Sequence, residues 1–158
     1  PNINQMPAKF RLHKQMANVT GTVLWYAKAV VDNVGNYQNV LRNVYWKKPV
    51  LQPRFTYIDG KAPKKVRNLK LMSIDGDKIL FWTKPKGNGW KEEAVKYVVY
   101  EFNANEKIDL EDASKIIGIT NEQFFKIRKK GEVRKMFIVT ALDRMANESK
   151  PKKIKVKN

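Results

Sequence analysis

Trp25, Tyr26 and Lys28 are the side chains whose types and spacing best suit ligand binding. The two aromatic residues end a short apolar run, and the lysine follows closely. If that run is a strand of a parallel barrel, these residues lie near its carboxyl end, where barrel enzymes form their active sites. A ring there could stack on a sugar, and the ammonium could meet an acidic or hydroxyl group. The alternative is that both rings pack against neighbouring strands.

A second candidate site is the basic turn formed by Lys126, Arg128, Lys129 and Lys130. The net charge of +17 favours attraction to nucleic acid, acidic glycans or anionic membranes. The chain has 25 lysines and 7 arginines, however, and readers of bases and phosphates rely on the arginine fork. We therefore expect weak polyanion binding at low salt and no specific recognition of nucleic acid.

Catalytic residues are not expected in this chain. Hydrolysis of a glycosidic bond generally needs two carboxyl groups on either side of the bond, and Asp32 is the only acidic residue among the first 50. His13, the only histidine, falls on the face of a predicted helix and is assigned to packing or to the surface. The chain alone should be inactive.

No metal or cofactor is expected either. The sequence has no cysteine, which excludes disulfides and zinc-thiolate sites. Asp75-Gly76-Asp77 lacks the spacing of a calcium loop and reads as a tight turn. The acidic run from Asp109 to Asp112 is assigned to a surface loop. No run of apolar residues reaches the length of a membrane span.

The elements of the first 50 residues are predicted from their apolar periodicity. Residues 4–17 and 36–46 place apolar side chains at helical spacing, with Pro7 in the first turn of the first helix. The run Gly21 to Tyr26 is apolar and β-branched, which indicates a strand buried on both faces. A helix-strand-helix unit of this kind is a piece of an α/β architecture.

The rest of the chain is predicted to be an antiparallel sandwich of short strands. In residues 136–142, the side chains that would point to either face of a strand are apolar or β-branched, which indicates a central strand. The segment 153–157 is rich in lysine and suits an edge strand. The other strands are expected at 66–74, 78–82, 97–102, 115–120 and 123–127. About seven strands in this length are typical of an immunoglobulin-like sandwich. Its predicted core is Leu80, Trp82, Tyr97, Val99, Phe137, Val139 and Ala141.

Several of these core positions resemble those of a fibronectin type III module. They are Leu80, Trp82, Tyr97, Val99, Val139, Ala141 and Asp143. Such modules usually have a tyrosine four residues before the valine that corresponds to Val139. Here that position is Lys135.

A longer pattern resembles the C-terminal part of the glycosyl hydrolase-like family 10 proteins, bacterial envelope proteins in which a (β/α)8 barrel precedes a fibronectin-like domain. The pattern consists of the segment 49–59, Pro63, 80–82, 97–100, 139–144 and 147–149. The resemblance implies that residues 1–50 are the end of the barrel, 51–62 a linker and 63–158 the sandwich.

The resemblance also implies a non-catalytic accessory region of a parent glycoside hydrolase that acts on cell-wall or related polysaccharide. That parent would be a periplasmic or surface lipoprotein, or a secreted protein. Because the sequence opens on Pro1, we expect either that it starts inside a longer protein or that processing removed its start. The alternatives are a stand-alone basic sandwich that binds glycan or polyanion, and a purely structural spacer. Since a barrel fragment would leave apolar surface uncovered, self-association through Val23, Trp25 and Leu41 is also expected.

Overall fold

The computed structural model describes residues 5–19, 21–87, 89–127 and 134–156. They divide into two compact units, Pro1–Lys47 and Lys48–Asn158. The first unit is helical. Its elements are α1 (Gln5–Gln15), α2 (Lys28–Val31), the 3-10 turn η1 (Val34–Asn36), α3 (Tyr37–Val40) and the π-helical turn η2 (Leu41–Tyr45).

Aromatic packing holds the first unit together. Phe10 of α1 is buried and lies 5.0 Å from the ring of Tyr45, centroid to centroid, and the Tyr45 hydroxyl donates a 3.0 Å hydrogen bond to the carbonyl of Pro7. Leu41 is also buried, as the helical stripe predicts. Val44 lies three positions after Leu41, on the same apolar stripe of the helix predicted at 36–46. Its side chain is exposed, because the π-helical turn changes the angular spacing of the side chains.

Both predicted helices of this unit are confirmed, but the strand predicted from Gly21 to Tyr26 is wrong. Residues 21–26 make no ladder, and the side chains of Val23 and Trp25 are 91% and 96% exposed. A strand needs a neighbour for its backbone groups, and the described part of this unit contains only helices and turns. Tyr26 then takes a left-handed conformation, with φ of 70°, which ends the extended run.

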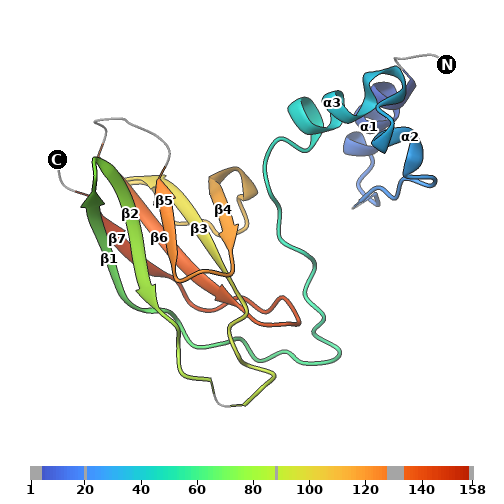
Figure 1. Ribbon diagram of the computed structural model, residues 1–158. Helices are drawn as coiled ribbons and strands as arrows, with labels where there is room; N and C mark the ends of the chain where they lie inside the picture. Colours follow the sequence, from blue (N-terminus) through green and yellow to red (C-terminus); the bar gives the residue numbers. More distant parts are fainter. Residues whose placement is uncertain (1–4, 20, 88, 128–133, 157–158) are drawn as a thin grey trace. The chain divides into compact units, whose positions relative to one another are not determined.

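The second unit is a sandwich of two antiparallel sheets (Figure 1). One sheet has the order β1-β2-β5 and the other β4-β3-β6-β7. Their bounds are β1 (Arg67–Ile74), β2 (Asp77–Thr83), β3 (Lys96–Asn103), β4 (Ile116–Thr120), β5 (Phe124–Ile127), β6 (Lys135–Leu142) and β7 (Lys152–Lys155). The chain is therefore mainly β, with the immunoglobulin/fibronectin type III-like sandwich that the sequence predicts.

The strands confirm the predicted turn and the predicted central and edge strands. Asp75 and Gly76 both take positive φ values, 49° and 80°, as a two-residue hairpin between β1 and β2 requires. β6 pairs with β3 on one side and with β7 on the other, which confirms its central position. β7 is one edge strand of its sheet, with Lys153 and Lys155 exposed. The turn predicted at 128–131 lies outside the described residues.

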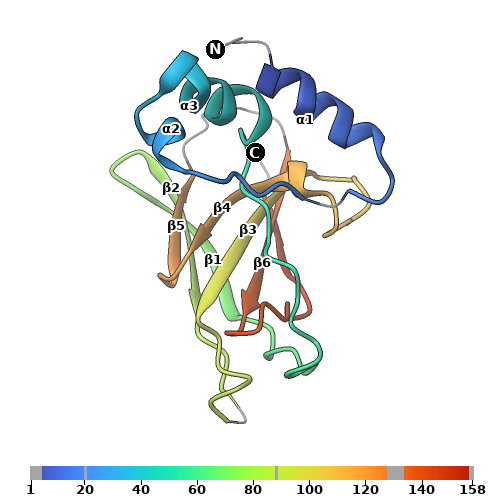
Figure 2. The ribbon, with the colours of Figure 1, turned by 90° about the vertical axis from the view of Figure 1, so that its right-hand side faces the viewer.

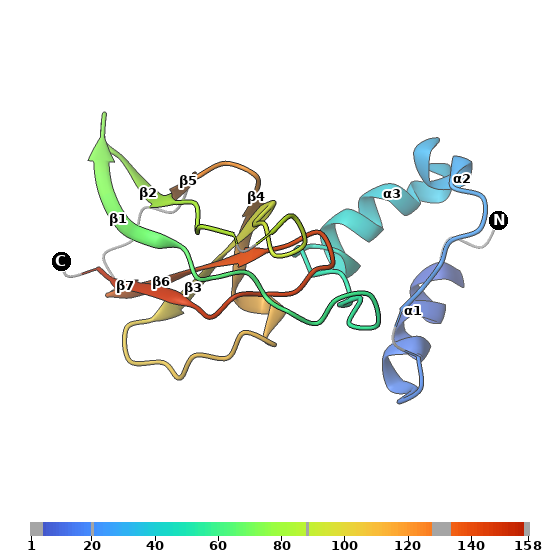
Figure 3. The ribbon, with the colours of Figure 1, turned by 90° about the horizontal axis from the view of Figure 1, so that it is seen from below.

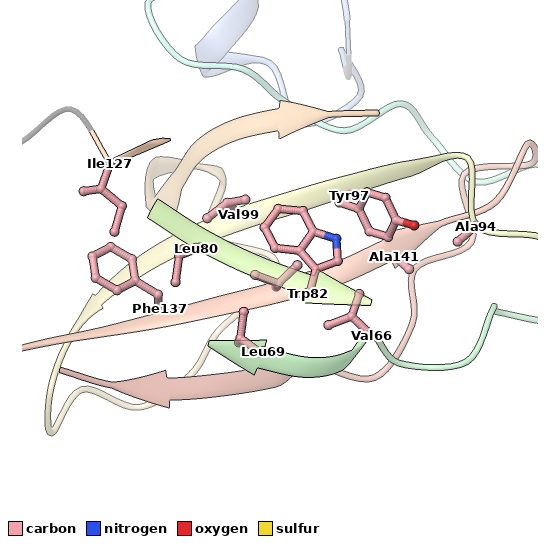
Figure 4. Close-up of a cluster of buried hydrophobic side chains, with 11 residues drawn as sticks. Val66, Leu69, Leu80, Trp82, Ala94, Tyr97, Val99, Ile127, Phe137 and Ala141 are labelled. Atoms are coloured by element: carbon pink, nitrogen blue, oxygen red, sulfur yellow. The ribbon is translucent and has the colours of Figure 1, made fainter. Parts of the chain in front are cut away.

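The core between the sheets is the predicted one. All seven predicted residues belong to a single buried cluster, together with Val66, Leu69, Ala94 and Ile127 (Figure 4). The rings of Trp82 and Tyr97 meet edge to face, with centroids 5.3 Å apart. This contact joins β2 of one sheet to β3 of the other.

The outer face of the four-stranded sheet is also buried. Val98, Tyr100 and Ile138 are fully inaccessible and belong to a second apolar cluster. Leu51 from the predicted linker packs on this cluster, as do Ile108, Leu110 and Ala113 from the β3–β4 connection, which runs beside the sheet (Figure 3). Residues from Lys48 onward therefore belong to the sandwich unit, and β3 and β6 are covered on both faces.

Candidate functional site

The structure does not gather the predicted ligand residues into a pocket. Trp25 and Tyr26 are 96% and 67% exposed, and Lys28 forms an ion pair of 2.5 Å with Asp32. The first unit has a pocket of about 310 Å³, but other residues line it. They are Phe10, His13, Val19, Gly21, Thr22, Tyr45 and Trp46.

The predicted basic turn is described only at its first residue. The Lys126 ammonium lies 2.5 Å from Oδ2 of Asp77, on the neighbouring strand β2, and both side chains are about half exposed. This pair offsets part of the positive charge at the start of the turn. Arg128, Lys129 and Lys130 lie outside the described residues.

The best-defined polar site is the place where the predicted linker meets the turn after β6. We call residues 51–59 and 143–149 together the linker anchor. The amide of Phe55 donates a 3.0 Å hydrogen bond to the carbonyl of Met145. The side-chain amide of Asn147 donates one of 2.9 Å to the carbonyl of Asp59. Two backbone positions of the linker are thereby fixed to the turn.

The turn is shaped by Asp143, which is buried. Its Oδ1 accepts hydrogen bonds from the amides of Met145 and Asn147, at 2.8 and 2.9 Å, and its Oδ2 accepts one of 3.0 Å from the Asn147 side chain. Ala146 takes a φ of 61°, which reverses the chain. Because Asp143 fixes Asn147, and Asn147 in turn holds Asp59, one carboxylate organises the anchor.

Glu148 ties the same turn to the sheet. Its Oε1 accepts hydrogen bonds from the buried Tyr100 hydroxyl, at 2.7 Å, and from Thr140 Oγ1, at 2.6 Å. Burial, and then the bond to Glu148, raise the pKa of Tyr100 well above its usual value. Glu148 also lines a groove of about 460 Å³ with Arg54 and Glu111. Because one carboxylate oxygen of Glu148 accepts hydrogen bonds from two hydroxyl groups, this side chain is assigned a structural role.

The candidate cation ligands have local roles. Asp109 Oδ1 accepts a hydrogen bond from the amide of Glu111, and Asp112 Oδ1 accepts one from the amide of Ser114. Within the described ranges, no three acidic or histidine side chains come together as a metal site would need. Over the same ranges, no helix has the length and apolarity to cross a membrane.

The reasoning from sequence missed Asn147 as an anchoring residue. The acceptor of the Asn147 side chain is the carbonyl of Asp59, which lies 88 positions away in the chain. A local signal does exist, since an aspartate followed four residues later by an asparagine suits a turn closed by side-chain hydrogen bonds. This local pattern identifies the turn, but it does not identify the linker segment that the Asn147 side chain binds.

Comparisons with known proteins give low similarity. No family model matches, and no curated protein matches. Among solved structures, titin domains A168–A170 are 21% identical (TM-score 0.45; 60% of this chain and 32% of that chain covered). The Endo-D glycoside hydrolase domain of Streptococcus pneumoniae R6 is 14% identical (TM-score 0.40; 61% and 15%). A fourth FNIII domain of a human protein is 15% identical (TM-score 0.44; 73% and 87%).

The chain thus spans about a third or less of the titin and Endo-D structures that it matches. Structures with fibronectin type III domains and structures of glycoside hydrolases both occur among its neighbours, at low identity and partial coverage. The fold assignment itself rests on the two antiparallel sheets and their strand order.

Proposed function

We propose that this chain is the non-catalytic C-terminal accessory region of a bacterial cell-envelope glycoside hydrolase-like protein that acts on cell-wall or related polysaccharide. In that role, the sandwich would hold the linker that precedes it in a fixed position. The observation that carries this proposal is the hydrogen bond from Asn147 to Asp59. It joins the segments 49–59 and 147–149, both of which carry the resemblance to the glycosyl hydrolase-like proteins.

An anchored linker suits an accessory role because it limits where a preceding domain can move. A flexible linker spreads the distance between two domains over a broad range, whereas a segment held at several points does not. Here residues 51–59 are held at Leu51 by apolar packing and at Phe55 and Asp59 by hydrogen bonds.

The proposal is tested with an antibody raised against this chain, applied to fractionated cells that make the protein. We expect the antigen in the envelope or secreted fraction, on a polypeptide longer than this chain by about 200 residues, because residues 1–50 would supply only the end of a barrel of about 250 residues. The immunoprecipitate should cleave purified cell-wall polysaccharide, and this chain alone should not. A cytosolic antigen, or an antigen no longer than this chain, would contradict the proposal.

A further inference from the structure

We propose that a basic pocket beside the β2–β3 loop binds an anionic polysaccharide, one that carries carboxylate or phosphate groups. The pocket has a volume of about 550 Å³. Its lining comes from two segments, Lys61, Ala62 and Lys64 on one side and Lys86, Gly87 and Glu92 on the other. It is separate from the linker anchor and from the turn at Lys126.

Buried prolines flank the lining of this pocket on both sides. Pro63 and Pro85, which adjoin the lining lysines, are both buried, and the ring of proline restricts the backbone. Lys84 and Glu93 form a 2.6 Å ion pair at the base of the loop, and the hydrogen bond from Lys84 lowers the pKa of Glu93. The loop is also closely folded, since a Cβ on Gly87 would lie 3.3 Å from the carbonyl oxygen of Gly89.

The charge of the site selects an anion. Residues 59–65 and 84–93 contain six lysines and three acidic residues. The side chains of Lys61, Lys64 and Lys86 stay exposed although they line a concave surface. A concave surface whose lining has three lysines and one acidic residue has a net positive charge and concentrates anionic ligands.

Two further features favour a sugar polymer over nucleic acid. Trp90 lies in the same loop with its side chain 65% exposed, and Lys91 Nζ is 5.8 Å from the centroid of its ring. An exposed indole offers an apolar face to a sugar ring. Glu92 places a carboxylate in the lining, where it would accept hydrogen bonds from sugar hydroxyls.

The pocket shares one end of the sandwich with the linker anchor. In Figures 1 and 2 the β2–β3 loop, the linker and the turn after β6 all lie at the same end of the strands. The site does not rest on the proposed accessory role, since a stand-alone sandwich could use it equally.

The test compares the full chain with the double variant Lys61→Ala/Lys86→Ala in titrations with polygalacturonate and with poly(glycerol phosphate). We expect affinity for at least one polymer to fall on the order of tenfold, as the loss of two exposed charge contacts implies. The matched control is Lys70→Ala/Lys153→Ala, which removes the same charge from exposed positions on β1 and β7. It should change affinity less than about twofold.

Trp90→Ala provides an independent measurement. It should weaken binding by about two- to tenfold and remove the change in tryptophan fluorescence on titration. Equal losses in the pocket variant and in its charge-matched control would overturn the proposal, because diffuse attraction would then account for binding. Tighter binding of single-stranded DNA than of either polymer, at the same salt concentration, would also overturn it.

Discussion

The hydroxyl of Tyr100 donates a 2.7 Å hydrogen bond to Oε1 of Glu148, and so joins the middle of β3 to the turn after β6. The Tyr100 side chain is fully buried. Burial is the larger cause of its raised pKa, followed by the bond to Glu148. The neutral phenol is therefore the form that the folded chain requires.

This relationship predicts a loss of stability in alkali. In the unfolded chain a tyrosine releases its proton near pH 10, whereas folded Tyr100 keeps it. Above about pH 10 the unfolded state thus binds fewer protons than the folded state, and the free energy of unfolding falls as pH rises. Tyr100→Phe should make that fall shallower in urea melts, and should cost about 1–3 kcal/mol at pH 7. Tyr57→Phe, at an exposed ring, should leave both quantities unchanged.

The contact between the two sheets at Trp82 gives a second prediction. Trp82→Ala should lower the free energy of unfolding by about 3–5 kcal/mol, because it empties a buried aromatic site. The indole Nε1 is buried without a partner in the described part of the chain, so Trp82→Phe loses no hydrogen bond and should cost clearly less. Trp90→Ala, at an exposed indole, should stay within about 0.5 kcal/mol. A loss under about 1 kcal/mol for Trp82→Ala would contradict the core assignment.

Gly118 gives a third prediction. A Cβ at this position would overlap the ring of Phe125, which packs on the core. Gly118→Ala should therefore cost about 1–3 kcal/mol through overpacking. Adding Phe125→Leu should recover part of that loss, so that the two changes are not additive. Gly60→Ala is the control, since its new methyl group would meet only the carbonyl oxygen of Thr56, at 3.9 Å.

Self-association is the fourth prediction, and the structure changes its expected contact. Val23 and Trp25 are exposed and remain available for a contact between two copies of the chain, whereas Leu41 is buried and is not available. Val23→Ser/Trp25→Ser should reduce association measured by light scattering at high concentration, whereas Leu41→Ala should destabilise the first unit instead. Tyr57→Ser is the control at another exposed ring. If the whole chain is monomeric at every concentration measured, the prediction of self-association is wrong.

The sandwich could be predicted because its signals are local. Residues 136–142 are apolar or β-branched in both registers, and the structure buries both faces of that strand. The prediction of a strand at 21–26 was wrong because it depended on a partner strand, which is not a local feature. Val23 and Trp25 have the composition of a buried strand, but only a partner strand can satisfy its backbone, and no local pattern reports whether one is present.

The covering of the outer face could not be predicted for a similar reason. Leu51 and Leu110 lie in segments without strand or helix periodicity, and they pack on a cluster whose members come from β3 and β6, distant in the sequence from Leu51. The basic pocket likewise depends on residues 61–64 and 86–92 meeting in space. Composition predicts its charge but not its concave form.

The linker anchor also constrains the order of events during synthesis. Asp59 leaves the ribosome long before Asn147, and their hydrogen bond spans 88 positions. Leu51 likewise cannot be covered until β6 has paired with β3. The first part of the sandwich to be made thus waits for the turn after β6, so the sandwich should complete its folding only once residues up to about 149 have left the ribosome. Folding should also be slow, because these contacts join distant parts of the sequence.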